Sequence, residues 1–323
     1  MIRIPIAFVS NDKGVLMLGI ALYSLLTNAY SDTHYVIYIL DDSISEANKD
    51  KISGLRSLHS CEIHFIAISG ILESFAYKAH GSWPANMYAR LHLPTLLTAE
   101  TRVLYMDIDV LVTGDLSELF IQETPPQCLA SVIYEEQDEG IEDRKRYLGL
   151  HKEHKYFNSG VMLMELERMR RDHTESKIQD CIRQNKIQLF YPDQDILNIA
   201  LTRRVQGIHP KWNCPSYLVG LRALRGKSMW GEISKEAVLE AVVKPRILHF
   251  LAHPKPIKRY NKQYLWYKYR KIWLQSPWKN VPVKDTHRAL ALWRMFRCSI
   301  RDIRISMMMH FVRSKLKKKK VVS

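Results

Sequence analysis

Alternation between strand-like and helix-like segments over residues 3–68 constrains the fold of this chain more than any other feature. Apolar runs typical of buried strands occur at residues 3–9, 34–40 and 62–68. Two helical segments are predicted between them, at residues 14–28 and from an N-cap at Ser45 to about Ser57. This order is typical of a mostly parallel sheet flanked by helices, so we predict an α/β fold.

The remainder of the chain continues this alternation less regularly. The patterns predict a helix at residues 86–97, strands at 103–106, 128–133, 160–166 and 247–250, and a helix at 196–201. Residues 254–285 combine several prolines with aromatic residues, and we expect an extended lid or linker there rather than core. Helical spacing returns at residues 286–314.

Two carboxylates, Asp107 and Asp109, follow the strand at residues 103–106. Residues i and i+2 of an extended chain point to the same side, and open α/β sheets bind ligands at the carboxyl ends of their strands. Two carboxylates in one place repel each other unless a cation lies between them. A divalent ion that also binds phosphate oxygens meets that need. The alternative is a polar turn after a strand, because Asp-x-Asp also occurs by chance.

Two metal-dependent chemistries use Asp-x-Asp after a strand. In phosphatases of the haloacid dehalogenase type the first Asp is a nucleophile, the motif follows the first strand, and Thr or Val stands two residues after the second Asp. Here the motif follows roughly the fourth predicted strand, and Leu111 occupies that position. The other chemistry, glycosyl transfer from a nucleotide sugar, is favoured by the rest of the chain.

Two polar positions earlier in the chain are also candidates for substrate contacts. Asn11 and Asp12 follow the first predicted strand, where their side chains could bond a base or a ribose; a simple Asx turn is the alternative. Arg90 stands on an otherwise apolar helix and could contact a phosphate bidentately. An exposed Arg whose stem lies on the apolar surface is the alternative there.

Two later segments complete the set of candidates. Asp193, Gln194 and Asp195 precede the helix at 196–201; one of them is expected as a cap, but three polar groups exceed what capping requires. His249 lies in a short strand, and Lys255 follows it six residues later. His249 could complete an Asp/Asp/His site suited to Mn²⁺, and Lys255 could meet a phosphate. A structural histidine is the alternative, since the chain has 13.

Composition and charge narrow the class of protein. The chain has 323 residues, 46% of them hydrophobic, which suffices for one α/β domain with an appendage. Its five cysteines form no Cys-x-x-Cys pair, which indicates a reducing compartment rather than disulfides or a zinc site. The opening apolar run is too short for a signal peptide, and no run is long enough for a spanning helix, so we expect a cytoplasmic protein.

Basic residues concentrate in the last quarter of the chain. Residues 244–323 hold 22 Lys and Arg against two acids, a net charge of +20, whereas residues 1–243 hold 26 against 31, a net charge of −5. Such asymmetry indicates an anionic partner, either a membrane surface or nucleic acid. The candidate site residues lie mostly in the acidic part, and no RNP, KH or helix-turn-helix signature is present, so we expect no nucleic-acid partner.

Six segments in order resemble glycosyltransferase family 8, the retaining enzymes of GT-A type, over about residues 3–275. They are Ile44–Asn48, Tyr88–Leu91, Val103–Asp109, Phe157–Val161, Asp193–Asn198 and His249 through Lys255–Pro256. The resemblance is greatest to bacterial lipopolysaccharide and lipooligosaccharide α-galactosyl- and α-glucosyltransferases. It implies a GT-A-type sheet flanked by helices in residues 1–275, followed by a basic, mostly helical C-terminal appendage in residues 276–323.

The resemblance also implies roles for individual residues. Asp107, Asp109 and His249 would hold Mn²⁺, or alternatively Mg²⁺, against the diphosphate of a UDP-hexose. Asn11, Asp12 and Ile108 would line the uridine, and Lys255 would meet a phosphate. Arg90, Asn158, Asp193 and Gln194 would surround the transferred hexose, galactose or glucose. Gln194 is a poor nucleophile, so retention is expected through attack by the acceptor on the same face. A catalytically inactive glycan-binding relative is the alternative, although the Asp/Asp/His set is complete.

The C-terminal segment has the pattern of a membrane-associated helix. Its apolar residues recur at spacings of three or four, at Trp293, Phe296, Ile300, Ile303, Met307 and Phe311. Arginines run alongside, and Lys317–Lys320 closes the chain. Basic amphipathic helices lie in the membrane interface and are attracted by anionic lipid. We therefore expect peripheral binding to the cytoplasmic face of the inner membrane, near a lipid-linked oligosaccharide acceptor; packing of the stripe on the catalytic domain is the alternative.

Overall fold

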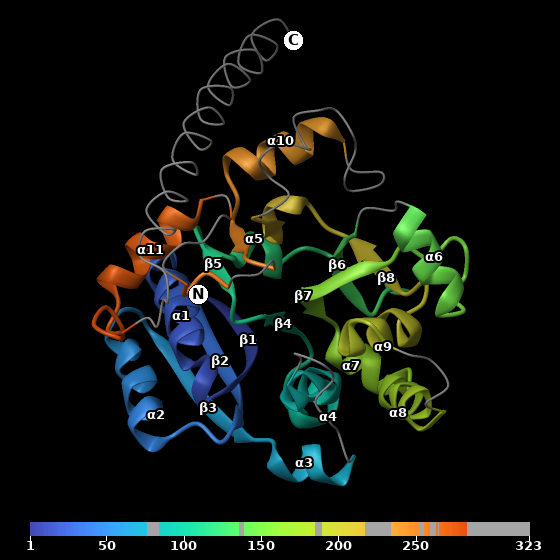
Figure 1. The fold of residues 1–323 in the computed structure, drawn as a ribbon, viewed down its shortest axis with the longest axis horizontal. Helices are drawn as coiled ribbons and strands as arrows, with labels where there is room; N and C mark the ends of the chain where they lie inside the picture. The colour runs from blue at the N-terminus through green and yellow to red at the C-terminus, as the bar shows by residue number, and fades with distance from the viewer. Residues whose placement is uncertain are drawn as a thin grey trace, which may run out of the picture.

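A mixed seven-stranded sheet forms the centre of the molecule (Figure 1). The computed structural model describes residues 1–75, 84–135, 139–184, 189–216, 234–251, 255–258, 263 and 265–282. The sheet order is β3-β2-β1-β4-β7-β6-β8. Its strands are β1 (Ile2–Asn11), β2 (Thr33–Asp42), β3 (Cys61–Ala67), β4 (Val103–Met106), β6 (Ala130–Tyr134), β7 (Phe157–Met164) and β8 (Val205–Gly207). Among these described strands β7 alone is antiparallel to its neighbours, so the predicted mostly parallel α/β sheet is confirmed.

Each face of the sheet has its own apolar core, because residues along a strand alternate between the faces. Ile4, Ile6 and Phe8 of β1 pack in the first core with α1 (Val15–Thr27) and α11 (Trp266–Gln275). Ala7 and Val9 of the same strand pack in the second core. The helices on that side are α4 (Leu93–Leu96), α7 (Leu166–Arg171), α8 (Thr174–Gln184) and α9 (Pro192–Ala200).

A three-stranded sheet places residues from three distant parts of the chain side by side. It contains β5 (Val110–Val112), β10 (Ile247–His249) and β9 (Cys214–Pro215) in that order. The strand β10 pairs antiparallel with β5, with His249 opposite Val110, and parallel with β9, with His249 opposite Pro215. Because β5 follows Asp109 directly, this pairing brings His249 to the Asp-x-Asp turn.

Most predicted elements are present, with shifted ends. The strand β1 extends to Asn11, so Ser10 and Asn11 belong to the strand and not to a following loop. The segment predicted as one helix at 86–97 is a 3-10 helix over Ala85–His92 followed by the short α4, where Pro94 stands in the first turn. The strand predicted at 160–166 begins earlier, at Phe157, so Asn158 and Ser159 lie within it.

The prediction of an extended lid or linker at residues 254–285 is wrong for its described C-terminal part. Residues 266–275 form α11, and Tyr269 and Trp273 of this helix are buried in the first core. Trp278 is buried as well and lies against Gly19 of α1, where a Cβ would approach its ring to 2.6 Å. Prolines in this segment suggested an irregular chain, but burial of its aromatic residues outweighs that preference.

The other described α-helices are α2 (Glu46–Ser53), α3 (Ser69–Ser74), α5 (Ser117–Phe120), α6 (Glu139–Tyr147) and α10 (Lys235–Val243). Of these, α2, α3, α6 and α10 lie around the outside of the molecule, whereas α5 lies near its middle, beside β5 (Figure 1). Ser45 is the N-cap residue of α2, as predicted, although its side chain makes no capping hydrogen bond. None of the helices described here is both long and apolar enough to cross a bilayer. The helix predicted at 286–314 lies outside the described residues.

Candidate functional site

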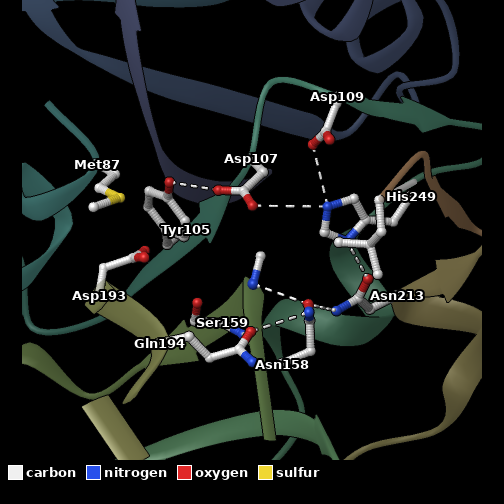
Figure 2. Close-up of polar contacts among 12 residues, drawn as sticks. Met87, Tyr105, Asp107, Asp109, Asn158, Ser159, Asp193, Gln194, Asn213 and His249 are labelled. Carbon is white, nitrogen blue, oxygen red and sulfur yellow. Dashed lines mark hydrogen bonds and ion pairs between the residues drawn. The ribbon is translucent and has the colours of Figure 1, made fainter. Parts of the chain in front are cut away.

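The three predicted metal ligands meet at the carboxyl end of β4. Candidate ligand atoms of Asp107, Asp109 and His249 all lie within 4.8 Å of one another (Figure 2). His249 Nε2 is 3.2 Å from Asp109 Oδ1 and 3.7 Å from Asp107 Oδ2. Asp109 and His249 are buried, whereas Asp107 is partly exposed. Two carboxylates and an imidazole nitrogen form a set of donors that fits a divalent transition metal such as Mn²⁺.

Two cationic side chains pair with these carboxylates. Lys255 Nζ lies 2.5 Å from Asp109 Oδ2, and Arg90 Nη2 lies 2.8 Å from Asp107 Oδ1. Burial by itself raises the pKa of Asp109, but the neighbouring His249 and the Lys255 ammonium outweigh it, and the net effect lowers the pKa. Lys255 therefore contacts the Asp109 carboxylate in this structure, and its predicted contact with a phosphate stays a prediction.

Arg90 is buried, and the alternative of an exposed arginine is wrong. Its Nε lies 2.9 Å from Asp193 Oδ2, so one guanidinium joins Asp107 to Asp193. The guanidinium also lies over the Tyr105 ring, 4.4 Å from the centroid, and the Tyr105 hydroxyl donates to Asp107 Oδ1 at 2.7 Å. Burial and the nearby Asp107 raise the pKa of Asp193, with Arg90 opposing both.

Three amide side chains form a hydrogen-bonded row beside the carboxylates (Figure 2). Asn158 Nδ2 and Gln194 Oε1 are 3.2 Å apart, Asn213 Nδ2 and Asn158 Oδ1 are 2.9 Å apart, and His249 Nδ1 lies 2.8 Å from Asn213 Oδ1. All of these side chains are buried. The row thus connects two predicted hexose contacts, Asn158 and Gln194, to the predicted metal ligand His249.

Asp195 has a structural role within the Asp193–Asp195 segment. The helix α9 begins at Pro192, and its N-cap residue Tyr191 makes no side-chain capping bond. Asp195 is fully buried, pairs with Arg144 and accepts a 2.6 Å hydrogen bond from the Tyr156 hydroxyl. Its Oδ2 also accepts the backbone N–H groups of residues 190 and 191, which fixes the chain ahead of α9. In the first turn of α9, Asp193 then pairs with Arg90, and Gln194 points to Asn158 and Ser159 (Figure 2).

The predicted uridine contacts lie together near the Asp-x-Asp turn. Asn11 Oδ1 accepts the Gly14 N–H at 3.1 Å, a local turn of the kind weighed as the alternative. Asp12 is exposed, and its Oδ1 accepts from Asn48 Nδ2 and Ser45 N, both at 2.8 Å, which lowers its pKa. A Cβ on Gly14 would lie 2.8 Å from Ile108 Cδ1, so Ile108 reaches this turn. Contact with a nucleotide stays a prediction for all three predicted residues.

Several residues of the site were not found from the sequence. Asn213 stands between Trp212 and Cys214, and the one signal was a polar amide within an apolar stretch, since buried amides require partners. Tyr105 was interpreted only as part of an apolar strand. Nothing in the sequence pattern singled out Tyr156 or Arg144. Both belong to the site only through their contacts with Asp195, which lies far from them in the sequence.

The chain matches a family model and several known proteins in sequence. The sequence profile described as "Glycosyl transferase family 8" matches residues 5–270. General stress protein A of Bacillus subtilis is 28% identical over 251 residues, which cover 76% of this chain and 85% of that protein. A lipopolysaccharide 1,2-glucosyltransferase of Escherichia coli is 26% identical over 273 residues, covering 82% of this chain and 76% of that enzyme.

A solved structure shows the same fold. The galactosyltransferase LgtC, crystallised with donor and acceptor sugar analogs, superposes with a TM-score of 0.71 at 24% identity, covering 86% of this chain and 98% of LgtC. The GT-A-type arrangement of a mostly parallel sheet flanked by helices is therefore confirmed. Because the family model matches residues 5–270, most of the chain, this chain belongs to glycosyltransferase family 8.

Proposed function

We propose that this protein is a metal-dependent, retaining hexosyltransferase that moves galactose or glucose from a UDP-sugar to a saccharide acceptor of bacterial lipopolysaccharide or lipooligosaccharide. The observation that carries the proposal is the convergence of Asp107, Asp109 and His249 at the ligand-binding end of the sheet. Family membership supports sugar transfer. The relatives described as lipopolysaccharide glucosyltransferases support the class of acceptor.

Asp107, Asp109 and His249 would hold Mn²⁺, because the two carboxylates and the imidazole nitrogen together suit a transition metal; Mg²⁺, which would use mainly the carboxylates, is the alternative. When bound, the ion would supply Lewis-acid stabilisation of the negative charge on the departing UDP. Lys255 contacts Asp109 and would exchange this partner for a donor phosphate. Asn11, Asp12 and Ile108, gathered at the neighbouring turn, would line the uridine.

Arg90, Asp193, Asn158 and Gln194 would surround the hexose. Arg90 pairs with both Asp107 and Asp193, so it fixes the distance between the metal cluster and the first turn of α9. The Asp193 carboxylate would orient a sugar hydroxyl, since accurate positioning contributes several kcal/mol to catalysis. Asn158 and Gln194 add amide groups whose own partners hold them in place.

The hydrogen bonds of Gln194 support same-face attack rather than a covalent intermediate. Gln194 Oε1 accepts from the Ser159 N–H at 3.1 Å and from Asn158 Nδ2 at 3.2 Å, which occupies both of its lone pairs. Its oxygen is therefore not available as a nucleophile. The acceptor hydroxyl would attack an oxocarbenium-like anomeric carbon on the face that UDP leaves, and its proton would pass to a leaving phosphate oxygen.

A screen of UDP-sugars tests the proposal. We expect turnover with UDP-galactose or UDP-glucose in the presence of Mn²⁺, loss of turnover in excess EDTA, and recovery when Mn²⁺ is restored. Asp107→Ala and Asp109→Ala should abolish transfer while leaving the melting temperature near that of the wild type. Full turnover in EDTA, or near-normal rates in either variant, would contradict the proposed metal site.

We further propose that the basic segment after the catalytic domain holds the enzyme at an anionic membrane, on the cytoplasmic face of the inner membrane. The net charge of +20 over residues 244–323 supports this, and membrane binding would place the enzyme beside a lipid-linked acceptor. Residues 283–323, with the apolar stripe from Trp293 to Phe311, lie outside the described residues. Since Trp278 packs in the core, we propose that the segment begins near residue 283 rather than at residue 276.

A further inference from the structure

The direction of every hydrogen bond in the row of amides can be deduced from groups that only donate or only accept. An amide oxygen and nitrogen are distinguished by their partners. The Asp195 carboxylate accepts from the Tyr156 hydroxyl at 2.6 Å, so the Tyr156 oxygen accepts from Gln194 Nε2 at 3.2 Å. The Gln194 oxygen must then face the backbone N–H of Ser159, and it does, at 3.1 Å. Both ends of this amide are thus assigned independently.

The same reasoning assigns the hydrogen-bond directions of the next two amides, Asn158 and Asn213. Asn158 Oδ1 accepts the backbone N–H of Gly160 at 3.0 Å, which leaves Asn158 Nδ2 to donate to Gln194. Asn213 Nδ2 donates to the same Asn158 oxygen at 2.9 Å. Asn213 therefore presents its oxygen to His249 Nδ1, 2.8 Å away.

An amide oxygen can only accept, so His249 Nδ1 must carry a proton. The other ring nitrogen, Nε2, then faces Asp109 Oδ1 at 3.2 Å and Asp107 Oδ2 at 3.7 Å. With the Nδ1 N–H held by Asn213, Nε2 is the ring nitrogen directed at both carboxylates, so its lone pair can bind a cation that all three groups share. Metal-binding histidines commonly donate their second N–H in this way, which fixes both the tautomer and the orientation of the ring.

We propose that Asn213 is a positioning residue for the metal centre: it holds His249 with Nε2 directed at the two aspartates, and its own orientation is set from Asp195 through Tyr156, Gln194 and Asn158. This inference rests on the proposed metal-dependent function and deepens it. It also implies that the hexose side of the site and the metal side share one continuous hydrogen-bond network.

Binding of Mn²⁺ alone, measured from the electron paramagnetic resonance of the free ion, tests the role of Asn213 without requiring turnover. Asn213→Leu removes both hydrogen bonds at similar volume and should weaken Mn²⁺ binding by about 10- to 100-fold. Asn213→Asp keeps an acceptor for the Nδ1 proton, as carboxylates provide in other metal sites, but it loses the hydrogen bond to Asn158, so its loss of Mn²⁺ affinity should be clearly smaller than that of Asn213→Leu. Asn213→Ala replaces the leucine variant if that variant does not fold.

Cys214→Ala is the matched control, because Cys214 is the next residue, is equally buried and packs in the apolar core. It should leave Mn²⁺ affinity unchanged. Wild-type affinity in Asn213→Leu would overturn the role of Asn213 alone, and so would an equal loss in Asn213→Leu and Asn213→Asp, which would indicate packing. If the wild type and Asp109→Ala bind Mn²⁺ equally weakly, the metal site itself is wrong and this inference fails with it.

Discussion

Gly160 of β7 and His249 of β10 approach so closely that a Cβ on residue 160 would lie 2.1 Å from His249 Cε1. The same Cβ would lie 2.7 Å from Asp107 Oδ2. The space in which these two predicted metal ligands meet therefore exists only because residue 160 has no side chain. This is a requirement for close approach, not for an unusual backbone conformation.

We predict that Gly160→Ala displaces His249, weakens Mn²⁺ binding at least tenfold and reduces transfer in proportion. Overpacking of a buried site of this kind also destabilises the fold, by about 1–3 kcal/mol. Titration with Mn²⁺ and thermal unfolding measure the two effects. Gly54→Ala is the control, because nothing lies within 4 Å of a Cβ there; it should be neutral or slightly stabilising. Wild-type Mn²⁺ affinity in Gly160→Ala would show that the site can relax around the methyl group.

Asp193 and Gln194 should differ in their effect on turnover. Asp193→Asn keeps the shape of the side chain but removes the charge that pairs with Arg90. We expect kcat to fall by about 100-fold, because a small displacement of the reacting sugar has an effect of that size. Gln194→Ala removes hydrogen bonds of the amide row without removing a nucleophile, so a loss of about tenfold or less is expected. Asp172 lies between α7 and α8 and pairs with Lys177 and Arg204; Asp172→Asn weakens these ion pairs and should leave kcat unchanged.

Stereochemistry provides an independent check of these roles. Nuclear magnetic resonance of the first-formed product should show the α configuration with wild type and with Gln194→Ala. A β-linked product would contradict the proposed retention, and a complete loss of activity in Gln194→Ala would restore Gln194 as a candidate nucleophile.

His154 should make the fold less stable in mild acid. Burial lowers the pKa of His154 below its ordinary value of 6.5, and both ring nitrogens are engaged, with Asn198 Oδ1 at 3.0 Å and the Arg203 N–H at 3.1 Å. A neutral ring donates to the first and accepts from the second, whereas a protonated ring opposes the Arg203 N–H. The stabilisation is therefore present above pH 6.5 and is lost as the pH falls from there toward the lowered pKa of the folded state.

Denaturant unfolding of the wild type and His154→Gln at pH 7.5 and pH 5.5 measures this effect. The wild type should be the more stable protein at pH 7.5, and the difference should narrow at pH 5.5. A difference that is the same at both pH values would show that His154 does not titrate in this range.

The basic C-terminal segment should bind anionic lipid. In liposome sedimentation the full chain should pellet with anionic vesicles at low salt and much less at high salt. Each Lys or Arg near the membrane surface should contribute about 1 kcal/mol to the binding free energy. A chain ending at Lys284 retains Trp278 and should stay in the supernatant. Replacing Lys315 and Lys317–Lys320 by Gln keeps the length and should weaken binding. Equal pelleting of all three proteins, or indifference to lipid charge, would exclude a membrane role.

The sequence was sufficient to predict the elements whose pattern is local. The apolar runs identified β1, β2, β3 and β4, and the end of a predicted strand identified Asp107 and Asp109 as a pair. His249 was only a possible third ligand from the pattern, and the family resemblance implied the complete set, which the structure brings together. Asn213 could not be predicted, because only the pairing of β9 with β10 brings it to His249. Local composition also failed for α11, since its burial depends on a contact with α1, about 250 residues earlier in the chain.

The reversed direction of β7 has a consequence for how this site can change over evolutionary time. Because β7 runs antiparallel to β4, its first residues, Asn158 to Gly160, face the end of β4 from within a paired strand. Loops tolerate insertions and new shapes, but a central strand cannot shift without moving both neighbours. In descendants of this protein, we expect substitutions that change sugar specificity to occur in α9 and the surrounding loops, while residues 158–160 remain unchanged.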